Sequence, residues 1–269
     1  MKSFRLIILS ALTTFAIVSC HQEDMDDYSA TDKNSVSIEF DNRIGDQKLV
    51  LGTTTAKNSS GEDFTVTTLN YFVSNIALKN DKGETVKFPN DYFLIRQSDS
   101  KSLIATLKDV PASNYTELSY TIGVDSLKSI SDVSQRTGVL DPASYGNDNM
   151  YWSWNSGYIF FKMEGTSTAI PANASGLQKY QFHIGGFGGR TSVTPNNLRT
   201  LTFPLSKNAK VRKDIAPVVH VISDVTKVFS AVNQISLAKS SVIMAPAAGK
   251  VVSENYAKSF IVDHVHNDH

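Results

Sequence analysis

The sequence predicts an all-β fold, a β-sandwich with short helical insertions. Many short segments either alternate apolar and polar side chains or are continuously apolar, and turn-forming residues separate them. No repeat and no strong internal linker interrupts the chain after its N-terminal region, so one domain over residues 34–269 is the simplest organisation. Cys20 is the only cysteine, so the fold must be stabilised by its core or by a metal rather than by disulfides.

The expected strands are distributed along the whole domain. Residues 35–40 alternate with the two-residue period of a half-buried strand. Further strands are expected at residues 47–52, 64–80, 84–95, 102–108, 115–124, 150–164, 178–185, 198–205 and 216–223. Two segments are expected to be helical instead: residues 223–231, with Ser223 as a candidate N-cap, and residues 247–260.

The first twenty residues predict export and lipid anchoring. Lys2 and Arg5 precede an uncharged apolar segment, residues 6–19, which is short for a membrane span and fits a signal peptide better. The segment ends in Ile17-Val18-Ser19-Cys20, the pattern that lipoprotein signal peptidase cleaves. Cleavage would leave Cys20 as a lipidated N-terminus, and each methylene buried in a membrane contributes about 0.8 kcal/mol to anchoring. An ordinary secretory signal with an incidental cysteine is the alternative.

Residues 20–33 are polar and predict a linker between the anchor and the domain. Their acidic side chains follow Cys20 closely and indicate either a solvated tether or, by resemblance to some Gram-negative lipoproteins, a surface-export signal: Glu23, Asp24, Asp26 and Asp27. We therefore expect an outer-membrane lipoprotein on the periplasmic face or at the cell surface. The chain has 26 basic and 26 acidic side chains, and this balance argues against a nucleic-acid partner.

Both tryptophans lie in one short segment, residues 150–158. On a strand, Met150, Trp152 and Trp154 would share one face, which is typical of a core stripe. Ser153, Asn155, Ser156 and Gly157 make the segment more polar, which favours a place where another group approaches closely.

Five of the six histidines lie beyond residue 180 and are candidate metal ligands. His264 and His266 form an H-x-H pair whose imidazoles would point the same way in an extended segment. Asp263, Asn267 and Asp268 flank the pair and could orient it. The further candidates are His183, His220 and the thioether of Met150. Imidazole and thioether ligands favour copper first and zinc second. The alternatives are a polar tail for the H-x-H pair and a structural role for His183.

The sequence lacks the motifs of three other classes of catalytic or cofactor-binding protein. The sequence has no G-x-S-x-G, no H-E-x-x-H and no C-x-x-C-H, so serine hydrolase, zincin and covalent c-type haem chemistry are not indicated.

Several of these residues together resemble the MbnP-like family. The resemblance covers residues 34–269 and rests on the segments Gly123-Val124-Asp125, residues 138–142, 150–158 and 162–165, Phe182-His183-Ile184-Gly185-Gly186, Asn255-Tyr256 and residues 264–268. The family's namesake is a periplasmic copper-binding partner protein of methanobactin-type gene cassettes. The resemblance implies a copper-binding β-sandwich without enzymatic activity and a partner di-haem peroxidase related to MauG and the cytochrome c peroxidases. It also implies oxidation of a tryptophan to kynurenine, here Trp152 or Trp154.

The leading hypothesis is therefore copper capture or handling outside the cytoplasm. A surface adhesion or glycan-binding lipoprotein, with Trp152, Trp154 and Tyr158 as a stacking platform, is the alternative. A zinc-dependent hydrolase is a third, less favoured one.

Overall fold

The computed structural model describes residues 28, 29, 31–154 and 157–268. The expected signal peptide, Cys20 and the acidic side chains of the linker lie outside the described residues. Within the described residues, no helix has the length and the apolar character needed to cross a membrane.

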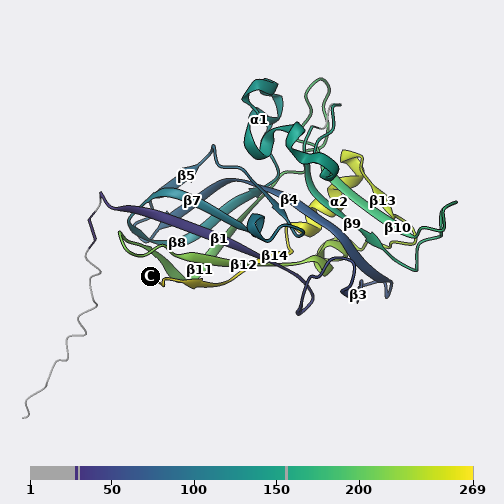
Figure 1. Cartoon of the computed structure of the whole chain (residues 1–269), viewed down its shortest axis with the longest axis horizontal. Helices are drawn as coiled ribbons and strands as arrows, with labels where there is room; N and C mark the ends of the chain where they lie inside the picture. Colours follow the sequence, from purple (N-terminus) through teal and green to yellow (C-terminus); the bar gives the residue numbers. More distant parts are fainter. Residues whose placement is uncertain (1–27, 30, 155–156, 269) are drawn as a thin grey trace, which may run out of the picture.

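Two sheets form the domain and confirm the predicted β-sandwich (Figure 1). The five-stranded sheet has the order β14-β12-β1-β2, with β7 also paired to β1. Its strands are β1 (Lys33–Ile44), β2 (Gln47–Lys48), β7 (Ile104–Pro111), β12 (Val218–Asp224) and β14 (Phe260–His266).

The nine-stranded sheet has the order β11-β8-β4-β9-β10-β13, and β3, β5 and β6 also pair with the long strand β4. Its strands are β3 (Thr55–Lys57), β4 (Asp63–Asn80), β5 (Thr85–Phe88), β6 (Phe93–Arg96), β8 (Ser113–Ile122), β9 (Ile159–Thr166), β10 (Lys179–Gly185), β11 (Arg199–Val211) and β13 (Val242–Ile243).

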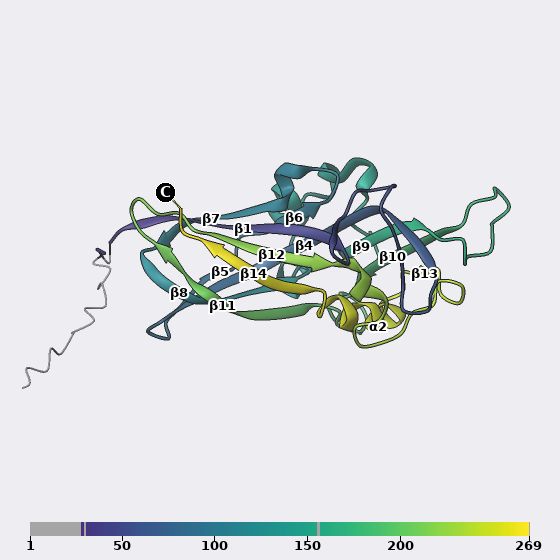
Figure 2. The ribbon, with the colours of Figure 1, turned by 90° about the horizontal axis from the view of Figure 1, so that it is seen from below.

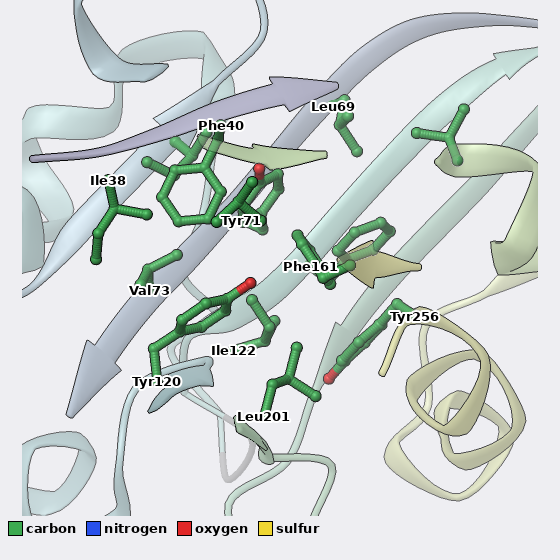
Figure 3. Close-up of a cluster of buried hydrophobic side chains, with 14 of the residues drawn as sticks. Ile38, Phe40, Leu69, Tyr71, Val73, Tyr120, Ile122, Phe161, Leu201 and Tyr256 are labelled. Atoms are coloured by element: carbon green, nitrogen blue, oxygen red, sulfur yellow. The ribbon is translucent and has the colours of Figure 1, made fainter. Parts of the chain in front are cut away.

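The main core lies between the two sheets and follows from the two-residue period of the strands. In β1, Val36, Ile38 and Phe40 are buried, whereas Glu39 and Asp41 between and beside them point to the outer face. Figure 3 shows Ile38 and Phe40 facing aromatic and aliphatic side chains of the other sheet. Each fully buried side chain of this size contributes about 1.5–3 kcal/mol, so this interface dominates the stability of the fold.

A lobe of short helices interrupts the second sheet between β8 and β9. It contains α1 (Ser126–Ile130) and the 3-10 helices η2 (Val133–Gln135), η3 (Gly138–Leu140) and η4 (Pro142–Asp148). Figure 1 shows α1 standing out on one side of the molecule, whereas β12 and β14 lie on the other; Figure 2 gives the view from below, with β12 and β14 in front. The buried guanidinium of Arg136 holds the lobe together by donating to the carbonyls of Ser129 and Ser131 and to the Tyr151 hydroxyl.

The two expected helical segments differ in outcome. Helix α2 (Pro246–Tyr256) confirms the second one, although the chain returns to a strand at Phe260. The first segment forms only a 3-10 turn, η5 (Val225–Phe229), and the remaining 3-10 helix, η1 (Ser100–Leu103), was not expected. The predicted N-cap Ser223 is wrong: Ser223 belongs to β12, and the Asp224 carboxylate accepts from the Thr226 amide.

Candidate metal centre

A bulge in β14 gathers histidines and a carboxylate on the outer face of the five-stranded sheet. His264 lies opposite His220 of β12, but the next paired residue of β14 is Val262, opposite Val221. Asp263 is therefore the extra residue of a β-bulge, which re-aims its side chain. Its carboxylate consequently lies on the same face as His264, although adjacent residues of a regular strand point to opposite faces.

The H-x-H pair is arranged as the strand period predicts. The Nε2 atoms of His264 and His266 lie 2.7 Å apart. The Nδ1 atom of His264 lies 2.7 Å from Oδ2 of Asp263, and the ring of His220 stacks on that of His264 at 4.8 Å between centroids. Three imidazoles and one carboxylate thus converge on one patch, which we call the β14 cluster: His220, Asp263, His264 and His266.

The carboxylate of Asp263 determines which ring nitrogen of His264 carries the proton. An ionised Asp263 can only accept a hydrogen bond, so Nδ1 of His264 donates to it. In the neutral imidazole, Nε2 of His264 then holds the lone pair, and His266 donates its Nε2 proton to it. The hydrogen bond from His264 is the largest of the interactions that hold the pKa of Asp263 below its usual value.

The surroundings of the β14 cluster are polar and open on one side. A cavity of about 450 Å³ adjoins it, with His220 and Asp41 among its lining residues. Asp41 lies 3.9 Å from Nε2 of His220 and forms an ion pair with Arg43 at 2.7 Å. His264 is half-buried and His266 is exposed, so an ion can reach the cluster from solvent.

The sequence-predicted ligands divide into two groups. His264, His266 and His220 come together in the β14 cluster. His183 and Met150 do not join them: His183 lies in β10 of the other sheet, and Met150 is fully buried in a second apolar cluster beside the helical lobe. The structure therefore does not bring all the expected ligands into one site.

His183 instead belongs to a polar group between β9 and β10. Its Nε2 lies 2.6 Å from Oε1 of Glu164, and Lys162 lies 3.6 Å from the same oxygen. Burial lowers the pKa of His183 and outweighs its hydrogen bond with Glu164, which raises it. Burial raises the pKa of Glu164, but His183 and Lys162 outweigh this effect, so the net pKa falls. At neutral pH His183 is thus uncharged and donates through Nε2 to an ionised carboxylate.

The tryptophan segment forms a tight hairpin rather than the strand predicted from residue 150. Tyr151 bridges Tyr158, the Trp152 amide donates to the Gly157 carbonyl, and β9 begins only at Ile159. Asn155 and Ser156, at the tip, lie outside the described residues. Met150 and Trp152 precede the turn and Trp152 packs against the cluster that contains Met150, whereas Trp154 lies in the turn, so strand alternation does not set its direction.

The two indoles nevertheless pack on each other. Their centroids lie 5.0 Å apart with the planes tilted by 30°, and Trp154 is 48% exposed. Trp152 lies directly over Gly185 of β10, where a Cβ atom would approach its ring to 2.8 Å. Gly185 thus provides the space that the indole occupies, two residues along β10 from His183.

Two functional contacts were not visible in the sequence. Asp41 and Glu164 approach His220 and His183 through strand pairing between distant segments, and no local pattern marks either carboxylate. Asp263 and Asp268 were expected beside the pair, and both contact its rings. Asn267 has another role: it accepts from the Lys210 amide and donates to the Asn208 carbonyl, which fixes the end of β14 on β11.

Comparisons with known proteins identify relatives of most of the domain. The family model described as MbnP matches residues 33–245. MbnP from Methylosinus trichosporium has a similar structure, with a TM-score of 0.54 and 17% sequence identity over 81% of this chain and 82% of that chain. At this identity the likeness concerns the fold. No curated protein matches the chain. The matched region includes His183 and His220 and ends before Asp263, His264 and His266.

Proposed function

The chain belongs to the MbnP family, and from this premise we propose that it is an exported, lipid-anchored protein that binds copper as its cargo. Membership supports a methanobactin-related copper-handling role at the level of the family. The lipobox at Cys20 supports anchoring at the outer membrane. We propose capture or handling of the ion rather than catalysis.

The observation that carries this proposal is the pair of imidazole nitrogens in the β14 cluster. Nε2 of His264 and Nε2 of His266 face one another at hydrogen-bond distance, 2.7 Å, and an outward rotation of the exposed His266 ring would open the space for one ion between them. Nitrogen ligands bind copper and zinc at about 2.0–2.1 Å, so two such nitrogens must lie no more than about 4 Å apart. Asp263 orients His264 from behind through Nδ1, as carboxylates do for metal-binding histidines.

Copper is the preferred ion because of the ligand types. The cluster offers imidazoles and one carboxylate and no thiolate, because the only cysteine carries the proposed lipid. Imidazole suits both copper and zinc, and for equal ligands copper binds more tightly. Zinc is therefore the second choice.

For the modified tryptophan we propose Trp154. Its indole is 48% exposed, whereas Trp152 is partly covered and packs over Gly185. A di-haem peroxidase partner would have to contact this surface to oxidise the side chain.

Metal titration of the mature lipoprotein in detergent tests the copper proposal. We expect Cu(I) binding below micromolar and at least about a tenfold loss in the variant His264→Gln/His266→Gln. His183→Gln is the matched control, because it changes the same residue type on the other sheet, and it should keep this affinity. Absence of binding, or equal affinity of the double variant and the wild type, would refute the proposal.

Protein from the native host tests anchoring and modification separately. The N-terminal peptide should carry diacylglyceryl and acyl groups on Cys20, and Cys20→Ala should release the protein from membranes. A peptide containing residue 154 should gain one oxygen and lose one carbon, as conversion to kynurenine requires. Unmodified Trp152 and Trp154 in the native-host protein would refute the kynurenine proposal without affecting the copper site.

A glycan-binding or adhesion role is the second candidate, favoured by the exposed indole of Trp154 beside Trp152. The 30° tilt between the rings gives a curved platform rather than a flat one. This role predicts binding to cell-surface polysaccharide that chelators leave unchanged and that Trp154→Ala abolishes. Loss of binding on addition of a chelator would count against it.

A further inference from the structure

The ring of His264 carries a second nitrogen, Nδ1, and further ligand atoms lie near it. The two nitrogens of an imidazole point away from each other, so one ion cannot bind both. Nε2 faces His266, as the proposed copper site requires, whereas Nδ1 faces Oδ2 of Asp263, which Nδ1 of the stacked His220 ring also approaches. The β14 cluster therefore has two separate places for an ion, one on each side of the same ring.

The Nδ1 side has the composition of a metal site. One ligand atom each from His220, Asp263 and His264 can be chosen so that all of them lie within 4.8 Å of one another. Ligand atoms of a tetrahedral zinc ion lie about 3.3 Å apart. Oδ2 of Asp263 already lies 2.7 Å from Nδ1 of His264 and 3.5 Å from Nδ1 of His220, so the remaining difference lies between the two imidazoles, and a small tilt of the half-buried His264 ring would close it. Two nitrogens and one oxygen suit a divalent ion such as Zn(II) or Cu(II).

An unpaired buried nitrogen points to the same place. Nδ1 of His220 is inaccessible to solvent and has no hydrogen-bond partner among the described residues. It lies 3.5 Å from Oδ2 of Asp263. A buried polar atom without a partner destabilises the fold, and a metal ion at this position would satisfy it. His220 is thus oriented toward the place that the other two ligand atoms define.

We propose that the β14 cluster contains a second metal position, formed by His220, Asp263 and Nδ1 of His264, which takes a divalent transition-metal ion. It adjoins the Cu(I) position at Nε2 of His264 and His266 and shares the His264 ring with it. When both are occupied, His264 bridges the two ions as an imidazolate and has released its ring proton to solvent. This inference adds to the proposed copper function a site of different ligand type.

Separate titrations with Zn(II) alone and Cu(I) alone test the second position on the full mature chain. His220→Gln should weaken Zn(II) binding at least about tenfold and leave Cu(I) affinity unchanged, whereas His266→Gln should do the reverse. His264→Gln should weaken both. Wild type loaded with both ions should hold one of each per chain.

Nitrogen NMR of the histidine rings gives a readout that needs no variant. Zn(II) should shift the signals of His220 and of Nδ1 of His264, and Cu(I) should shift those of His266 and of Nε2 of His264. If His220→Gln and His266→Gln weaken both ions equally, or Zn(II) leaves the His220 signals unchanged, the second position does not exist while the copper function stands. If wild type binds neither ion, both proposals fail.

Discussion

Asp263 and His264 are adjacent in β14, yet their side chains lie on the same face and contact each other at 2.7 Å between Oδ2 and Nδ1. This relationship exists because Asp263 has no partner in β12, which makes it the bulged residue of the ladder. The β14 cluster thus depends on a local irregularity of the strand.

The first prediction concerns this contact. Asp263→Asn removes the charge that orients His264, and we expect Cu(I) affinity to fall about tenfold, in the range measured for outer-shell carboxylates. Competition with a chromophoric Cu(I) chelator measures it. Asp268→Asn is the control: Asp268 lies 3.5 Å from His266 and is 89% exposed, so we expect a change of about threefold or less. Equal affinity of Asp263→Asn and wild type would contradict an orienting role.

The second prediction concerns the pKa of His183. Burial lowers it, and the hydrogen bond to Glu164 partly restores it. Glu164→Gln should therefore lower the pKa of His183 further, because the variant loses the carboxylate that stabilises the imidazolium. NMR titration of the ring signals measures the shift, and His266, which lies on the other sheet, is the internal reference. An unchanged or raised pKa of His183 in the variant would show that Glu164 does not stabilise the charged imidazolium.

The third prediction concerns stability in acid. Burial raises the pKa of Glu62, but hydrogen bonds from the Asn58 and Ser236 side chains and from the amides of Leu237 and Ala238 outweigh it and lower the pKa to about 2. Because the pKa is lower in the folded state, the ionised Glu62 stabilises the fold at pH values above 4.5, its ordinary pKa. This stabilisation is lost as the pH falls toward 2.

Glu62→Gln should therefore cost about 1–2 kcal/mol at pH 7, a figure reduced from the full pKa shift because solvent screens a partly exposed group. The cost should shrink progressively in more acidic solution. Urea denaturation across this pH range measures it. Glu254→Gln, in α2, is the control and should be nearly neutral, because the amide oxygen of glutamine can still accept the hydrogen bond from Asn233. A cost independent of pH would contradict the role of the Glu62 charge.

The fourth prediction concerns the space for Trp152. A Cβ atom at Gly185 would lie 2.5 Å from the Tyr158 carbonyl oxygen and 2.8 Å from the Trp152 ring. Gly185→Ala should destabilise the fold by about 2–3 kcal/mol and displace the indole, with a shift in tryptophan fluorescence. Gly176→Ala is the control: its φ is +73° with open space around it, so it should cost about 1 kcal/mol and leave the fluorescence unchanged. Identical spectra for Gly185→Ala and wild type would contradict the packing.

The sequence predicted the features that depend on local patterns. The apolar pattern identified the longer strands of both sheets, because one face of each strand is buried in a sandwich, but β3, β13 and β14 lie outside the predicted ranges. The two-residue period of a strand placed His264 and His266 on one face. It failed for residues 150–154, because a tight hairpin replaces the strand there, and no periodic pattern distinguishes the two in so short a segment.

The sequence by itself therefore determined the β-rich class and identified the H-x-H pair as candidate ligands. Only the tertiary structure decided which residues join that pair. His220 stacks on His264 because β12 pairs with β14 in one particular register, and Asp263 faces both rings because a bulge interrupts that register. Register between distant strands is set by the packing of the whole core, so no local pattern could have revealed it.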